Sequence, residues 1–178
     1  MSAVKSILCK LGAHITEESG CWLVSSDARP RATDISTGPF PAFPTDTLGP
    51  CLPALAIADG VSVVHERIWN NRLSLAMELN RMAARIEIPV AQVAVFRGVP
   101  LLQGAIVVGT DPRATAALTI AGLIAEGESL ILGVDLLDNA YNSLDRKLRT
   151  LGARIERTRV SSEVYGVAHP SYGRLEAF

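Results

Sequence analysis

Residues 38–60 read GPFPAFPTDTLGPCLPALAIADG, and this stretch organises the rest of the chain. It begins as a Pro-rich loop, places a single acid, Asp46, at the end of that loop, and continues as an apolar segment. Thr45 and Asp46 occupy the place of a helix N-cap, and Pro50 and Pro53 predict that the regular helix starts after them. We interpret Asp46 as the chemical centre of the protein. A plain helix cap is the alternative.

Length and composition narrow the class of protein. The 178 residues favour one domain, and a hydrophobic content of 48% argues against disorder. The net charge of −1, with Lys and Arg scattered, argues against a nucleic-acid partner. No apolar run reaches the roughly 18 residues of a membrane span, and the N-terminus lacks the pattern of a signal peptide. We therefore expect neither nucleic acid nor membrane as a partner.

The chain has an odd number of cysteines, Cys9, Cys21 and Cys51, and their spacing is not that of metal ligands. We interpret them as reduced, mostly buried thiols of a cytoplasmic protein. A catalytic thiol is the alternative, but no paired base is visible near any of them. His65 lies in a predicted strand and is read as a structural histidine. We expect no metal and no cofactor.

Hydrophobic periodicity, glycines and prolines predict the other elements. Helices are expected at 3–11, 73–82, within 110–127 and at 144–151. Strands are expected at 13–15, 21–26, near 32–36, and at 61–68, 84–90, 92–98, 104–109, 129–137 and 153–160. Residues 1–158 are expected to form one globule, and the tail 159–178 has no assigned structure.

The chain repeats itself with a period of about 70 residues. Leu11-Gly-Ala-His-Ile15 recurs as Met82-Ala-Ala-Arg-Ile86 and Leu151-Gly-Ala-Arg-Ile155, and Ile57-Ala-Asp-Gly60 recurs 67 residues later as Ile124-Ala-Glu-Gly127. At that shift Asp46 falls on Arg113, and Arg72 falls on Asn139. The unit reads strand, helix, strand, helix, strand, strand.

One helix of each unit is apolar all round, so it must be buried. The repeat therefore predicts helices in the middle of the fold and sheets that cover them. If the units pack around a common axis, the four repeat positions meet at one end, beside helix N-termini that favour anions.

Several stretches carry a family resemblance: PAFPTD at 41–46, NNR at 70–72, DPRATAAL and AGLIAEG at 111–127, and LDNAY with RKLRTLGARIER at 137–157. They resemble the UDP-N-acetylglucosamine 1-carboxyvinyltransferases, which are enolpyruvyl transferases related to the 5-enolpyruvylshikimate-3-phosphate (EPSP) synthases. The resemblance covers about residues 3–158 and about half of the full enzyme.

This resemblance implies an α/β (α+β) fold, an inside-out α/β barrel or alpha-beta prism of βαβαββ repeats, as one globule of the usual two. It implies the transfer of enolpyruvate from phosphoenolpyruvate to the 3′-hydroxyl of UDP-N-acetylglucosamine, in peptidoglycan precursor synthesis. A complementary half, or self-association, then completes the site. The alternative is a degenerate, non-catalytic module that retains UDP-sugar binding or a structural role.

The resemblance also implies roles for single residues. Asp46 matches the acid–base carboxylate at the sugar hydroxyl, and Ile68 matches a position whose backbone touches the UDP-sugar. Arg72 and Arg113 match arginines of the phosphate- and carboxylate-binding cleft, where guanidinium forks bind anions bidentately. Asn139 replaces another active-site arginine, which removes charge-assisted hydrogen bonds worth roughly 1.5–3 kcal/mol each. None of the cysteines matches the family's catalytic cysteine.

Overall fold

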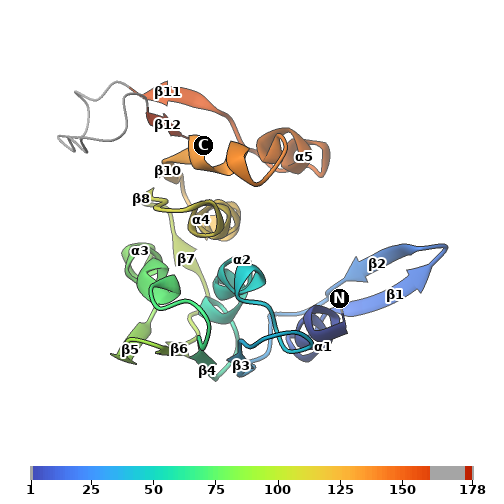
Figure 1. The fold of residues 1–178 in the computed structure, drawn as a ribbon. Helices are drawn as coiled ribbons and strands as arrows, with labels where there is room; N and C mark the ends of the chain where they lie inside the picture. Colours follow the sequence, from blue (N-terminus) through green and yellow to red (C-terminus); the bar gives the residue numbers. More distant parts are fainter. Residues whose placement is uncertain (1, 161–174, 178) are drawn as a thin grey trace.

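The computed structural model describes residues 2–160 and 175–177 as a mixed α/β fold. The chain begins with α1 (Ser2–Lys10) and an antiparallel hairpin of β1 (His14–Glu18) and β2 (Cys21–Ser25). This hairpin projects away from the other strands (Figure 1) and pairs with no further strand among the residues that the structure describes. The predicted first helix and first two strands are confirmed.

A complete βαβαββ unit follows the hairpin. Its elements are β3 (Ile35–Ser36), α2 (Thr45–Ala56), β4 (Val61–His65), the 3-10 turn η1 (Arg72–Ser74) with α3 (Leu75–Arg81), β5 (Ile86–Val90) and β6 (Val93–Arg97). The four strands form one sheet in the order β3-β4-β6-β5, with β3 parallel to β4 and the other neighbours antiparallel. This order of elements agrees with the unit read from the sequence repeat.

The second half of the chain repeats that order and adds two short strands, β7 (Leu102–Gln103) and β9 (Ala125–Glu126), which pair with each other in parallel. Its other elements are β8 (Ile106–Val108), α4 (Pro112–Ile124), β10 (Leu130–Leu132), the 3-10 helix η2 (Val134–Asn139), α5 (Leu144–Thr150), β11 (Thr158–Val160) and β12 (Leu175–Ala177). β8 pairs with β10 in parallel, as β3 does with β4, and β11 pairs with β12 antiparallel. β12 belongs to the predicted tail, of which residues 161–174 and 178 lie outside the described part.

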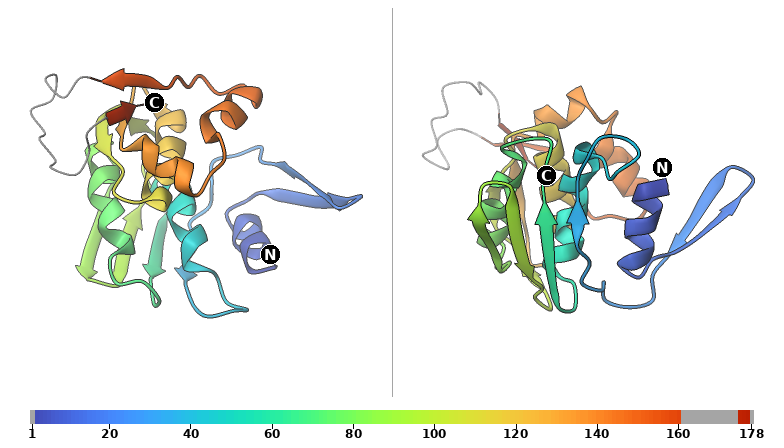
Figure 2. Two further views of the ribbon diagram at one scale, coloured as in Figure 1. Left: turned by 45° about the horizontal axis from the view of Figure 1, so that its top comes forward. Right: turned by 60° about the horizontal axis from the view of Figure 1, so that its bottom comes forward.

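The apolar helices α2 and α4 pack against each other in the core (Figures 1 and 2). Leu48, Leu52 and Leu55 of α2 and Leu118 of α4 are fully buried, as predicted for helices apolar on every side. The helices approach closely at their N-terminal ends, where a Cβ added at Gly49 would lie 3.2 Å from the carbonyl oxygen of Arg113. A glycine therefore brings the two helix starts together.

The start of α2 differs from the prediction. The helix begins at Thr45 and runs through both Pro50 and Pro53, although prolines inside a helix remove hydrogen bonds to earlier carbonyls. Burial of the leucines on this helix offsets that loss. Pro44 is the N-cap residue, and no side chain caps this end. Thr45 and Asp46 therefore lie inside the first turn, and their side chains are engaged elsewhere.

Several predicted strands are shorter than expected, most of all those predicted at 129–137 and 153–160. The strand predicted at 129–137 ends at Leu132, because Gly133 adopts a left-handed conformation with φ of 81° and η2 follows. The strand predicted at 153–160 comprises only residues 158–160.

The cysteines also differ in part from the prediction. All three are free, but Cys9 and Cys21 are exposed and only Cys51 is buried. Burial raises the pKa of the Cys51 thiol to about 11, so this thiol stays protonated near neutral pH. Across the described ranges, no helix combines the length and apolarity needed to cross a bilayer.

Candidate functional site

A pocket of about 370 Å³ lies where the N-terminal ends of α2 and α4 meet the turn after β4. Three segments far apart in the sequence supply its lining residues, which are Thr45, Asp46, Trp69, Arg72, Asp111 and Arg113. Two carboxylates and two guanidinium groups thus share one small space. Three of the four repeat positions predicted to converge, Asp46, Arg72 and Arg113, meet here.

One carboxylate oxygen of Asp46 accepts hydrogen bonds from both arginines. Arg113 donates from Nε to Oδ1 at 3.0 Å, and Arg72 donates from its terminal NH2 group to the same oxygen at 3.3 Å. Within residues 2–160 and 175–177, no donor reaches Oδ2 of Asp46. The side chain is 62% exposed, so this second oxygen is open to a ligand in the pocket.

Arg72 is the buried member of the cluster, with a side chain only 7% exposed. Besides Asp46 it contacts Asp111, at 3.5 Å from Nη1 to Oδ1, and its guanidinium lies 5.6 Å from the centre of the Trp69 ring. Its Nε is buried and has no acceptor among the residues described. A buried donor without a partner is costly, so Arg72 holds its place in the cluster with one hydrogen bond unmade.

Asp111 caps α4. Its carboxylate accepts from the backbone N–H groups of Arg113 and Ala114, at 2.8 Å and 3.2 Å, which is the geometry of a helix N-cap. Arg113 follows directly, and its hydrogen bond to Asp46 is the main cause that raises the pKa of its guanidinium. The positive end of the helix dipole disfavours a cation at this helix N-terminus. The negative charges of Asp46 and Asp111 offset that unfavourable interaction.

Glu66 lies behind the pocket and is fully buried. Oε1 accepts from the Thr37 hydroxyl at 2.8 Å and from the N–H groups of Ile68 and Trp69 at 2.7 and 2.9 Å, while Oε2 accepts from the Thr45 hydroxyl at 2.7 Å. Burial by itself favours the protonated acid, but these four hydrogen bonds outweigh it, so the pKa of Glu66 lies below its ordinary value.

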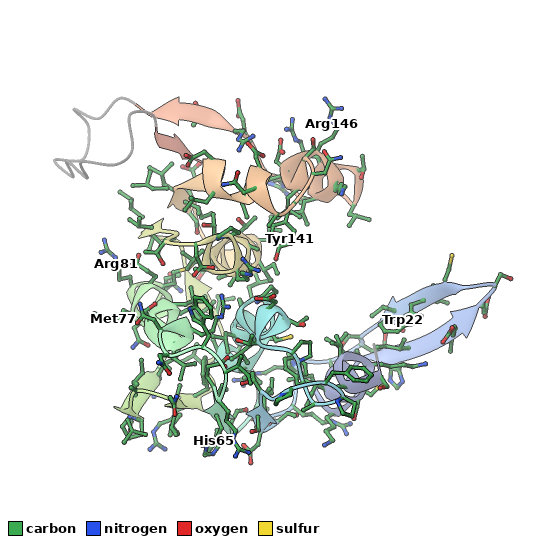
Figure 3. The ribbon with its side chains drawn as sticks, viewed as in Figure 1. Trp22, His65, Met77, Arg81, Tyr141 and Arg146 are labelled. Atoms are coloured by element: carbon green, nitrogen blue, oxygen red, sulfur yellow. The ribbon has the colours of Figure 1, made fainter. Side chains whose placement is uncertain are left out.

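Ile68 and Asn139 do not line the pocket. The N–H of Ile68 is engaged by Glu66, which leaves its carbonyl as the backbone group open to a ligand. Asn139 ends η2 and is exposed. Tyr141, two residues later, lies beside α4 (Figure 3) and is close enough to interact electrostatically with Arg113 and Asp46. Burial is the main cause that raises the pKa of Tyr141, so its hydroxyl remains a donor at neutral pH.

Sequence reasoning missed Glu66, Trp69 as a lining residue, and Tyr141. Alternation in the strand predicted at 61–68 places Glu66 on the same face as Val64, but the sequence shows none of the donors that make burial of a carboxylate possible. Trp69 is exposed at the rim of the pocket, and its ring faces the guanidinium of Arg72. Tyr141 belongs to the motif LDNAY at 137–141, and that motif is the sequence feature that could have identified it as a site residue.

This arrangement is suited to binding an anion with a hydroxyl beside it. The N-terminus of α2 carries no side-chain cap, so its first N–H groups and the helix dipole favour negative charge. Two guanidinium groups add charge-assisted donors. The open oxygen of Asp46 can accept a proton from a hydroxyl that lies within hydrogen-bond reach.

The sequence matches one family model and several named proteins. The family model of EPSP synthase (3-phosphoshikimate 1-carboxyvinyltransferase) matches residues 1–148. The UDP-N-acetylglucosamine 1-carboxyvinyltransferase of Nostoc sp. is 48% identical over 150 residues, which are 84% of this chain and 33% of the relative. The protein of the same name from Clostridium botulinum is 41% identical over 157 residues, 88% of this chain and 37% of the relative.

The chain thus spans about a third of the length of these curated relatives, rather than the half expected from the motifs. Solved structures show the same fold. The enolpyruvyl transferase NikO from Streptomyces tendae aligns over 90% of this chain and 37% of its own, with a TM-score of 0.79 and 22% identity. An EPSP synthase from Acinetobacter baumannii covers 99% of this chain and 38% of its own, with a TM-score of 0.60 and 14% identity.

Proposed function

Because this chain belongs to the EPSP synthase family, we propose that it forms part of an enolpyruvyl transferase that acts on UDP-N-acetylglucosamine. The reaction transfers enolpyruvate from phosphoenolpyruvate to the 3′-hydroxyl of the sugar and releases phosphate. The observation that carries this proposal is the cluster of Asp46 with Arg72 and Arg113 at the start of α2. The relatives named for this activity supply the substrate class.

The proposed roles follow from the contacts. Oδ2 of Asp46 accepts the proton of the sugar hydroxyl as general base, while Oδ1 stays hydrogen-bonded to the arginines. Arg72 and Arg113 bind the phosphate and carboxylate groups through their remaining N–H donors. The carbonyl of Ile68 accepts from the sugar, since its N–H is engaged. No cofactor takes part.

We further propose that another polypeptide surface completes the site, either a complementary half or a second copy. The exposed strand β2 supports this proposal, since Leu23 is 64% and Val24 53% exposed on a hairpin that pairs with no other described strand. The complete globule is proposed to be the alpha-beta prism, with α2 and α4 inside it.

A second candidate function is a non-catalytic module that retains UDP-sugar affinity. The exposed Asn139, at the position where the family resemblance expects an active-site arginine, favours this reading, because one guanidinium is missing from the cluster. Charge within the pocket is also balanced, with two acids against two arginines, so anion binding competes with internal ion pairs.

One assay separates the candidates: phosphate release, with UDP-N-acetylglucosamine and phosphoenolpyruvate as substrates, by the chain together with the polypeptide that completes its site. Turnover that Asp46→Asn abolishes, and that the exposed-site control Asp27→Asn retains, establishes the transferase. Absence of turnover, with a rise in melting temperature on adding the UDP-sugar, establishes the binding module. Absence of both contradicts both candidates.

A further inference from the structure

Glu66 is a fully buried acid that the proposed chemistry does not use. Its carboxylate accepts four hydrogen bonds, and the two oxygens divide them unequally. Oε1 accepts hydrogen bonds from Thr37, Ile68 and Trp69, whereas Oε2 accepts one from Thr45 alone. A buried ionised carboxylate needs such a full set of donors, and three of the four, Thr45, Ile68 and Trp69, lie on segments that supply the pocket.

The donors belong to three different segments. Thr37 follows β3, and its hydroxyl also accepts from the N–H of Arg67, which closes the turn after β4. Thr45 is the first residue of α2, directly before Asp46. Ile68 and Trp69 lead into η1, which begins at Arg72. One carboxylate therefore links the helix start that carries Asp46 to the turn that carries Trp69 and Arg72.

We propose that Glu66 is a positioning residue, which sets the first turn of α2 through Thr45 and so places Asp46 against Arg72 and Arg113. The hydrogen bond from Thr45 to Glu66 fixes the first turn, since the N-cap residue of α2 is Pro44 and no side chain caps the helix. As far as it concerns ligand binding, the inference rests on the proposed function. The placement of Asp46 does not depend on any ligand.

Thr45→Val tests the link because valine keeps the shape of threonine and removes the hydroxyl that Oε2 binds. Thr45→Ser keeps the hydroxyl and serves as the conservative rescue. Thr47→Val, in the same turn, is the matched control, since the Thr47 hydroxyl makes no hydrogen bond among the described residues. Loss of one charge-assisted hydrogen bond predicts about tenfold weaker binding of UDP-N-acetylglucosamine by Thr45→Val, with Thr45→Ser and Thr47→Val within about threefold of wild type.

A ligand-free measurement keeps the inference separate from the proposed function. The Nε–H resonance of Arg113 in a ¹H–¹⁵N spectrum reports its bond to Asp46 Oδ1. Thr45→Val is expected to shift or broaden this resonance, and Thr45→Ser and Thr47→Val are expected to leave it in place. If wild type fails to bind the UDP-sugar, the proposed function fails while this readout still decides the role of Glu66.

An unchanged Arg113 resonance in a folded Thr45→Val protein overturns the proposal, as does equal loss in Thr45→Val and Thr45→Ser. If Thr45→Val does not fold, Glu66→Gln replaces it. The glutamine retains Oε1 as acceptor for Ile68 and Trp69 and removes the negative charge from Thr45. The expected shift of the Arg113 resonance is the same, and its absence again contradicts the inference.

Discussion

Arg113 donates a hydrogen bond from Nε to Oδ1 of Asp46 at 3.0 Å, and the two residues are 67 positions apart in the chain. They are equivalent positions of the internal repeat, since the same shift of 67 aligns Ile57-Ala-Asp-Gly60 with Ile124-Ala-Glu-Gly127. The repeat thus places an anionic and a cationic side chain at the same point of two units, and packing of α2 on α4 brings them together. Five predictions follow from this arrangement and its surroundings.

Asp46→Asn is expected to strengthen the binding of inorganic phosphate while it weakens that of the UDP-sugar. The carboxylate neutralises Arg72 and Arg113, so its removal leaves two cations without this partner. One unit charge at about 4 Å in water is worth about 1 kcal/mol, or roughly fivefold in affinity. Isothermal titration with phosphate at low salt measures this gain, and Asp27→Asn provides the control. Unchanged phosphate affinity contradicts the pairing.

Arg72→Met is expected to lower the free energy of unfolding by about 2 kcal/mol, because it leaves Asp46 and Asp111 facing each other without the shared cation. The partial exposure of both acids keeps the loss below that of a fully buried pair. Urea unfolding measures it. Arg81→Met, which removes an exposed arginine 3.9 Å from Glu78, is expected to cost close to nothing.

Glu66 is expected to make the fold sensitive to acid. Its pKa is lowered in the folded protein, so its ionisation stabilises the fold fully above its ordinary pKa of about 4.5. That contribution is lost as the pH falls from about 4.5 through the lower pKa of the folded state. Urea unfolding between pH 6 and pH 3 should therefore show a smaller loss of stability in Glu66→Gln than in wild type.

The control for this acid dependence is Glu87→Gln, an exposed acid that pairs with Arg97 at 3.1 Å. It is expected to retain the wild-type loss of stability with falling pH. A Glu66→Gln protein that follows the wild-type curve would falsify the assignment of the lowered pKa to Glu66.

Gly49→Val is expected to push α2 away from α4 and to separate Asp46 from Arg113. A Cβ at Gly49 would lie 3.2 Å from the Arg113 carbonyl oxygen and 3.5 Å from the Arg113 Cβ, and valine adds two further methyl groups to it. Overpacking of this kind costs about 1–3 kcal/mol. Urea unfolding measures the cost. Because valine is a better helix former than glycine, helix propensity alone would stabilise the variant, so a loss of stability reports the contact with α4. Stability equal to that of wild type would argue against close contact between the helices.

The thiols are expected to react in two classes. Cys9 and Cys21 are exposed, whereas burial raises the pKa of Cys51 to about 11. Because the thiolate is the reactive form, Cys51 should resist alkylation by iodoacetamide at pH 8 until the chain unfolds. Mass spectrometry of the intact chain should show two rapid additions and a third in urea. Rapid modification of Cys51 in the folded chain contradicts its burial.

The sequence by itself determined the repeat, the buried character of α2 and α4, and three of the residues that meet in the pocket, Asp46, Arg72 and Arg113. These properties follow from local composition and from equivalence between units, both of which a single sequence displays. The family model then agreed with motifs already visible in the chain.

Only the tertiary structure decided how those residues are used. Leucine burial carries α2 through Pro50 and Pro53, so that Asp46 lies inside the helix and faces two arginines instead of capping it. The burial of Glu66 was equally hidden, because its four donors come from segments up to 29 residues away. Local patterns report which face of an element is apolar, whereas the partner of a polar side chain depends on long-range packing that no local pattern contains.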